Sequence, residues 1–255
     1  MIKCNSLCYS VKKKHILSDI DLTANNGEIT VIIGPNGSGK TSLMRCIAGI
    51  ISKKEFSSGN ILINGKDTAD YSQAERAAVL SYMPQSLAAP QITVSELVSY
   101  GRSPYIGSFG ILSDKDKKSV LSAIDRMSLT GFSNTPVSVL SGGEKQLAYF
   151  AMLLAQNTDN LLLDEPSSSL DEKHKAKIFD ELSELKKEGK AILLILHDIT
   201  DAVSIADSIS VIDGGRSVFH GSPDQFISSN IPKNVFGITP YEYKSDGKSM
   251  YFFSR

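Results

Sequence analysis

A glycine-rich stretch from Gly34 to Thr41 carries the residue types that bind phosphate. Its sequence, G-P-N-G-S-G-K-T, matches the pattern G-x-x-x-x-G-K-[ST] and lies between a β-rich run and a predicted helix. Glycines let successive backbone N–H groups face a phosphate, the helix N-terminus adds its positive dipole end, and Lys40 supplies a charge for the outer phosphates. The Thr41 hydroxyl suits Mg²⁺. The residues predicted to hold the phosphates are Gly34, Pro35, Asn36, Gly37, Ser38, Gly39, Lys40, Thr41 and Ser42.

Two adjacent acids, Asp164 and Glu165, follow the apolar run 160–163. Ligands of parallel α/β sheets bind beyond the carboxyl ends of the strands, where these acids are expected. We expect Asp164 to hold Mg²⁺ through its water shell, and Glu165 to orient and polarise an attacking water. Together with the glycine-rich loop, the two acids predict a hydrolytic site for a phosphate compound.

The strands expected around these groups fall into two kinds. Ser58-Gly59 and Asn64-Gly65 are turn signals on either side of a short strand, which indicates an antiparallel sheet near the N-terminus. The runs 160–163 and 191–196 enclose a predicted helix over 172–188 and form a βαβ unit, which requires a parallel sheet. The N-terminal strands are expected over 2–9, 20–24, 29–33 and 60–63.

Helical spacing marks an insertion between the two halves of the sheet. It dominates 95–131, and a further helix is expected from about 141 to 155. Near the end of the chain, two short runs around Ser245 to Lys248 suggest a hairpin. The predicted fold is therefore α/β, with one domain over 1–221, a helical subdomain over about 86–157, and a C-terminal extension over 222–255.

Composition limits the partners and the location. The net charge of -1 gives no bulk attraction to nucleic acid, so an anion must be held by a local site. The cysteines Cys4, Cys8 and Cys46 form no C-x-x-C pair and are expected to be reduced thiols. No signal sequence is recognisable, and the apolar runs are too short to span a bilayer. We expect an intracellular chain, and any membrane-spanning part on another chain.

The stretch Leu140 to Gln146, L-S-G-G-E-K-Q, resembles the signature motif of the ABC (ATP-binding cassette) ATPases. Other elements of that family follow in order: Tyr9 matches the A-loop, Gln85 the Q-loop, Ser168-Ser169-Leu170-Asp171 the D-loop, and His197 the H-loop. The resemblance covers 2–221 and implies an ABC-type P-loop fold that binds ATP and Mg²⁺ and hydrolyses ATP. Lys145, Asn160 and the order Thr41-Ser42 depart from the usual pattern without removing a carboxylate or a phosphate donor.

The resemblance also implies a role for each matched residue. Tyr9 would stack on adenine, and the carbonyl oxygen of Gln85 would reach Mg²⁺. Ser141, Gly142 and Gly143 open a helix and would bind the γ-phosphate held by a second copy of the chain, so hydrolysis would require a dimer. Asp171 would turn toward that second copy. His197 would contact the γ-phosphate across the site. Lys40, Glu165 and His197 would thus serve the in-line attack of water on the γ-phosphoryl group.

The region 92–105 looks like the ATPases of iron-siderophore, haem and cobalamin importers. It has their pattern T-V-x-E-L-x-x-x-G-R-x-P, and the helix start Leu112-Ser113 to Asp116 matches "L-S-x-x-D". This resemblance implies a homodimer at the cytoplasmic face of the cell membrane, docked through Ser86 to Tyr105 on transmembrane permease subunits and served by an extracytoplasmic binding protein.

Two alternatives stay open. The chain could be the ATPase of another ABC importer, or a soluble ABC ATPase such as an iron–sulfur assembly factor. A DNA-repair ATPase would need a long coiled coil between Lys40 and Ser141, and the spacing leaves no room for one. Glu165 and His197 are both present, which argues against a cassette that does not hydrolyse ATP.

Overall fold

A six-stranded sheet forms the centre of the described part of the chain. The computed structural model describes residues 1–12, 14–106, 110–168, 170–245 and 248–254. The strand order is β10-β9-β3-β8-β7-β6, with β9 and β10 antiparallel and the other neighbours parallel. This confirms the predicted parallel core and its βαβ unit. The strands are β3 (Glu28–Ile33), β6 (Leu80–Met83), β7 (Asn160–Asp164), β8 (Ala191–Ile195), β9 (Ser208–Asp213) and β10 (Arg216–Gly221).

The N-terminal sheet is antiparallel, as predicted, with the order β2-β1-β4-β5. One predicted turn is wrong: Ser58-Gly59 lies inside β4, not at its start. Gly59 has φ +84°, and a Cβ there would stand 2.4 Å from the Ser6 carbonyl oxygen, where β1 and β4 change register. The glycine marks a bulge in a strand. The strands are β1 (Ile2–Val11), β2 (Lys14–Ala24), β4 (Phe56–Ile63) and β5 (Lys66–Asp67).

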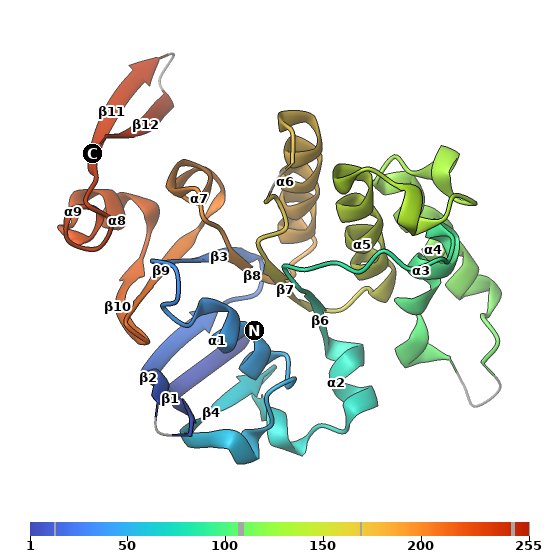
Figure 1. The fold of residues 1–255 in the computed structure, drawn as a ribbon, viewed down its shortest axis with the longest axis horizontal. Helices are drawn as coiled ribbons and strands as arrows, with labels where there is room; N and C mark the ends of the chain where they lie inside the picture. The colour runs from blue at the N-terminus through green and yellow to red at the C-terminus, as the bar shows by residue number, and fades with distance from the viewer. Residues whose placement is uncertain (13, 107–109, 169, 246–247, 255) are drawn as a thin grey trace.

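Helices cover the central sheet and extend beyond β6, on the right of Figure 1. In the part of the chain that the structure describes, no helix combines the length and the apolar character needed to cross a bilayer. The helices are α1 (Lys40–Ile47), α2 (Gln73–Val79), α3 (Val94–Tyr100), α4 (Asp114–Arg126), α5 (Gly142–Gln156), α6 (Glu172–Lys187), α7 (Ile199–Ile205), α8 (Pro223–Ser228) and α9 (Ile231–Phe236).

The central sheet is buried on both faces, because alternate residues of β3, β7 and β8 enter two separate cores. Leu161, Ile192 and Leu194 pack with the helical side, whereas Leu162 and Leu193 pack with α1 and the N-terminal sheet. Successive side chains of a strand point to opposite faces. The unbroken apolar runs in the sequence are therefore those of strands with two covered faces.

Arg102 and Asp116, which belong to the two sequence patterns noted at 92–105 and 112–116, connect the end of α3 to α4 and α5. Arg102 Nε donates to Asp116 Oδ1 at 2.8 Å, and Arg102 Nη1 donates to the Ala155 carbonyl at 2.7 Å. Both side chains of this ion pair are buried. Gly101 packs so closely on α5 that a Cβ would stand 2.2 Å from the Met152 carbonyl oxygen. Ser113 caps α4 in a capping box with Asp116.

The end of the chain forms the predicted hairpin. β11 (Thr239–Ser245) pairs antiparallel with β12 (Lys248–Ser254), in register from Thr239 with Ser254 to Ser245 with Lys248. The residues expected at its tip, 246–247, lie outside the described residues. The hairpin extends from the body of the molecule after α9, at the upper left of Figure 1.

Replacing Arg102 with Met tests the buried ion pair. The change leaves the buried Asp116 carboxylate without its cation, so we expect the thermal unfolding midpoint to fall by at least ~5 °C. Lys117→Ala is the matched control, because Lys117 pairs with Asp114 at 3.4 Å in an exposed position. Exposed ion pairs contribute little to the stability of the fold. The unfolding midpoint of this variant should therefore lie within ~1 °C of that of the parent. Equal midpoints for both variants, measured by circular dichroism, would contradict the account.

Candidate nucleotide site

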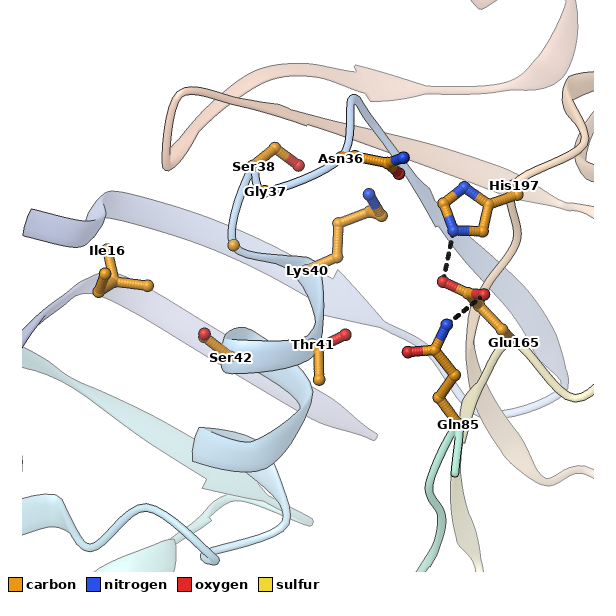
Figure 2. Close-up of a pocket in the computed structure, with 11 residues that line it drawn as sticks. Ile16, Asn36, Gly37, Ser38, Lys40, Thr41, Ser42, Gln85, Glu165 and His197 are labelled. Atoms are coloured by element: carbon orange, nitrogen blue, oxygen red, sulfur yellow. Dashed lines mark hydrogen bonds and ion pairs between the residues drawn. The ribbon is translucent and has the colours of Figure 1, made fainter. Parts of the chain in front are cut away.

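The glycine-rich loop connects β3 to α1 and lines a pocket of about 470 Å³ (Figure 2). The loop enters the helix at Gly39, which has no side chain to bond the first N–H groups of α1. These groups therefore stay available to an anion at the positive end of the helix dipole. The residues that line the pocket are Ile16, Asn36, Gly37, Ser38, Gly39, Lys40, Thr41, Ser42, Gln85, Glu165 and His197.

Close packing explains two glycines of the loop. A Cβ on Gly34 would stand 2.0 Å from the Ile212 carbonyl oxygen, and one on Gly39 would stand 2.9 Å from the Ile16 carbonyl oxygen. Gly39 also has φ +103°, a conformation that side chains rarely adopt. The hydroxyl of Ser38 is buried and has no hydrogen-bond partner among the described residues. A phosphate oxygen would satisfy this hydroxyl, so the loop fits the group that its sequence predicts.

Lys40 folds back over the loop. Its ammonium donates to the carbonyl oxygens of Gly34 at 2.8 Å and Pro35 at 3.0 Å. Burial lowers the pKa of Lys40, and the nearby carboxylates of Glu165 and Asp164 oppose that shift. A buried ammonium beside free backbone N–H groups suits a ligand that carries several negative charges.

Asp164 ends β7 with a carboxylate that is 1% exposed. Neither of its oxygens has a hydrogen-bond partner among the described residues. Burial raises the pKa of this carboxyl, while the nearby Thr41 hydroxyl, which lies outside regular hydrogen-bond geometry, and the Lys40 charge oppose the rise. Two buried acceptor atoms without donors fit a Mg²⁺ shell, which supplies the missing partners.

Glu165 is held from two sides. Gln85 Nε2 donates to Glu165 Oε2 at 2.7 Å, and His197 Nε2 lies 2.6 Å from Glu165 Oε1 (Figure 2). Glu165 also adopts φ +56° directly after the strand, which is uncommon for a residue other than glycine. Each carboxylate oxygen of Glu165 thus makes one contact here and keeps a lone pair for a further donor, such as a water.

The structure brings most of the predicted site residues to this one pocket, but Tyr9 lies elsewhere. Tyr9 is 8% exposed in the core of the N-terminal sheet and does not line the pocket. Ile16, which sequence reasoning missed, lines it instead. Its backbone is packed between Gly39 and Gly215, so its position depends on contacts across the fold. Stacking of Tyr9 on adenine remains a prediction.

The signature residues also lie away from the phosphate pocket. Ser141 caps α5 through a capping box with Glu144, and Gly142 lines a second cavity together with Gln85. Asp171 caps α6 by accepting from the His174 backbone N–H at 2.9 Å. Ser169 of the predicted D-loop lies outside the described residues. The chain thus presents its two predicted anion sites at separate places.

Asp164→Asn should stabilise the folded chain in the absence of nucleotide and metal. Because burial raises the pKa of this acid, its ionised form destabilises the folded state at neutral pH. We expect the unfolding midpoint to rise by about 3 °C at pH 7 in EDTA. The gain should shrink as the pH falls through the folded pKa toward the ordinary carboxyl pKa of about 4.

Asp171→Asn provides the control for this measurement. Hydrogen bonds from the backbone and side chain of His174 lower the pKa of Asp171, so its ionised form stabilises the fold. Its removal should not raise the midpoint. A lower midpoint for Asp164→Asn, or the same gain in both variants, would contradict the assignment of an uncompensated carboxylate at Asp164.

Comparisons with known proteins agree with this geometry. The family model described as ABC transporter matches residues 17–168. The iron(3+)-hydroxamate import ATP-binding protein FhuC of Bacillus subtilis is 35% identical over 88% of this chain and 82% of its own length. The ferric enterobactin transport ATP-binding protein FepC of Escherichia coli is 31% identical over 89% of this chain and 83% of its own.

Solved structures share the fold. A putative metal-chelate type ABC transporter in an inward-facing conformation has a TM-score of 0.85 at 22% identity, covering 99% of this chain and 96% of its own. A dimeric bacterial ABC transporter cassette has a TM-score of 0.78 at 25% identity, covering 88% and 99%. The phosphate loop, Glu165 and His197 line one pocket, and Asp164 directly precedes Glu165 at the end of β7. The chain belongs to the ATP-binding, ATP-hydrolysing subunits of the ABC transporter family.

Proposed function

We propose that this chain hydrolyses MgATP as a homodimer and thereby drives a membrane importer for ferric siderophores, haem or corrinoids. The observation that carries the proposal is the shared pocket of Lys40, Glu165 and His197, in a chain related to iron-chelate import subunits. The petrobactin importer subunit YclP of Bacillus subtilis, 34% identical over 94% of both chains, supports the same class of cargo.

Each residue of the pocket has a distinct task in hydrolysis. Lys40 and the N–H groups of the loop bind the outer phosphates, and Thr41, Gln85 and Asp164 would hold Mg²⁺, which neutralises charge on the phosphates when bound. Glu165 accepts a proton from the attacking water, and His197 orients the carboxylate through its contact at 2.6 Å. Gln85 donates to the same carboxylate and would thereby help to position it.

A second copy of the chain would complete the site. The N–H groups of Gly142 and Gly143 open α5 and have no acceptor within the helix. Gly142 lines a different cavity from the phosphate loop, which supports a role of this helix start toward the nucleotide of the facing copy. Asp171 is exposed beside them and would face that copy as well. The dimeric form of a related cassette supports this arrangement.

The helical side of the molecule would dock on the permease. The segment Ser86 to Tyr105 includes Tyr100, 58% exposed, and Tyr105, 41% exposed. Exposed aromatic side chains are typical of protein interfaces. The proposed division places this segment in a helical subdomain at 86–157, within a domain over 1–221 that is followed by a C-terminal extension. The chain would thus be peripheral at the cytoplasmic face of the membrane, with the extracytoplasmic binding protein on the opposite side.

Glu165→Gln tests the proposed base and the dimer together. Glutamine keeps the shape but cannot accept the proton, so hydrolysis should fall by at least ~100-fold while ATP stays bound. Light scattering with ATP should then show a stable dimer. Glu184→Gln is the control, because Glu184 pairs with Lys187 on the exposed face of α6. Normal turnover in Glu165→Gln would refute the role of the base, and a monomer with bound ATP would refute the dimer.

Affinity purification of the tagged chain from native membranes tests the transport partner. We expect a polytopic permease from an iron-chelate or corrinoid uptake system to co-purify. A permease of another substrate class would leave the ATPase role intact and overturn the cargo. A soluble partner alone would favour an ABC ATPase without transport, such as an iron–sulfur assembly factor.

A further inference from the structure

His174 lies between the signature helix and the D-loop. Its imidazole Nδ1 is 2.8 Å from Asp171 Oδ1. A Cβ on Gly143, in the first turn of α5, would stand 3.0 Å from Nδ1, 3.1 Å from Cγ and 3.2 Å from Cε1 of the same ring. The ring therefore packs on the bare backbone of Gly143. The imidazole joins two elements that are separated in the sequence and are both predicted to face a second copy.

The bond to Asp171 fixes the orientation of the ring. A carboxylate only accepts hydrogen bonds, so Nδ1 carries the proton in this pairing. The same Asp171 oxygen accepts from the His174 backbone N–H at 2.9 Å, which anchors the pair to the N-terminus of α6. The side chain of His174 is 25% exposed. The ring is therefore oriented by its own helix and presents a face to α5.

Two sets of hydrogen bonds connect α5 and the first turn of α6 to the surroundings of Glu165. The loop after Glu165 is bonded to α5 by Gln146, whose Nε2 donates to the Pro166 carbonyl at 2.7 Å. On the other side, Lys175 donates to both carboxylate oxygens of Asp201 at 3.1 and 3.2 Å, in the helix that follows the H-loop. The turn that carries the His174 ring thus contacts Gly143 of α5 on one side and α7, which follows His197, on the other.

We propose that His174 is a positioning residue of the ATPase: held by Asp171, its imidazole sets the position in which α5 presents the N–H groups of Gly142 and Gly143. The inference rests on the proposed dimer, because those groups act on the nucleotide of the facing copy. A methyl group on Gly143 would have to push the His174 ring by a few tenths of an ångström, so the ring and the backbone of α5 are in close contact here. Transition-state stabilisation depends on donors held at such precision.

Three substitutions of His174 separate this role from a general structural one. His174→Asn places an amide N–H where Nδ1 stands and should keep kcat within about twofold. The longer side chain in His174→Gln carries its amide past the position of Nδ1, and His174→Ala removes the donor to Asp171 altogether. Both should lower kcat of the full chain about tenfold. The binding of a fluorescent ATP analogue to the phosphate loop should stay within about twofold in all three variants.

A double-mutant cycle with Gly143→Ala tests the contact itself. The added methyl group should lower kcat in the parent chain. It should lower kcat by a smaller factor in the His174→Ala background, where no ring contacts it. An unchanged kcat in His174→Ala, equal losses in the Asn, Gln and Ala variants, or an additive cycle would overturn the inference. If Glu165→Gln forms no dimer with ATP, the proposed function fails. If it does and His174→Ala keeps full kcat, only the positioning role fails.

Discussion

The parallel pairing of four adjacent strands is the constraint on which the site depends. β3, β8, β7 and β6 lie side by side, and parallel strands end at the same edge of a sheet. The phosphate loop follows β3, His197 follows β8, the two acids end β7, and Gln85 follows β6. Asn36, Gln85, Glu165 and His197, which are far apart in the sequence, thus line one pocket because the strands that precede them are neighbours in the sheet. The two apolar cores cover both faces of these strands and stabilise the sheet.

At the nucleotide site, most charged side chains are paired with other groups of the protein. Lys40 bonds loop carbonyls, Glu165 bonds Gln85 and His197, and Asp164 alone among these keeps a buried carboxylate without a partner. Such a group costs stability in exchange for function, as is usual at active sites. The contacts of Glu165, the proposed base, also connect it to the loops that carry Gln85 and His197. Any shift of those loops on binding of nucleotide or partner therefore reaches the carboxylate directly.

Local signals predicted much of the fold and of the candidate site. The glycine pattern, the apolar runs before Asp164 and His197, and the hairpin signals correspond to elements that the structure contains. Contacts between segments that are far apart in the sequence could not be predicted from local patterns. The turn expected at Ser58-Gly59 is a bulge made by contact with β1, and Ile16 reaches the pocket through packing against Gly39 and Gly215. The contact of His174 with Gly143 likewise joins two different helices, and no sequence motif links these two residues.

The central claim is that each catalytic site combines the phosphate loop of one copy with the signature helix of another. Mixing two inactive variants tests it most directly: Lys40→Ala, which disables the phosphate loop, and Ser141→Arg, which blocks the signature motif. A mixed dimer contains one site with both an intact loop and an intact signature. We predict that the mixture regains ATP hydrolysis that neither variant shows alone. A mixture as inactive as its components, under conditions in which mixed dimers form, would contradict the account.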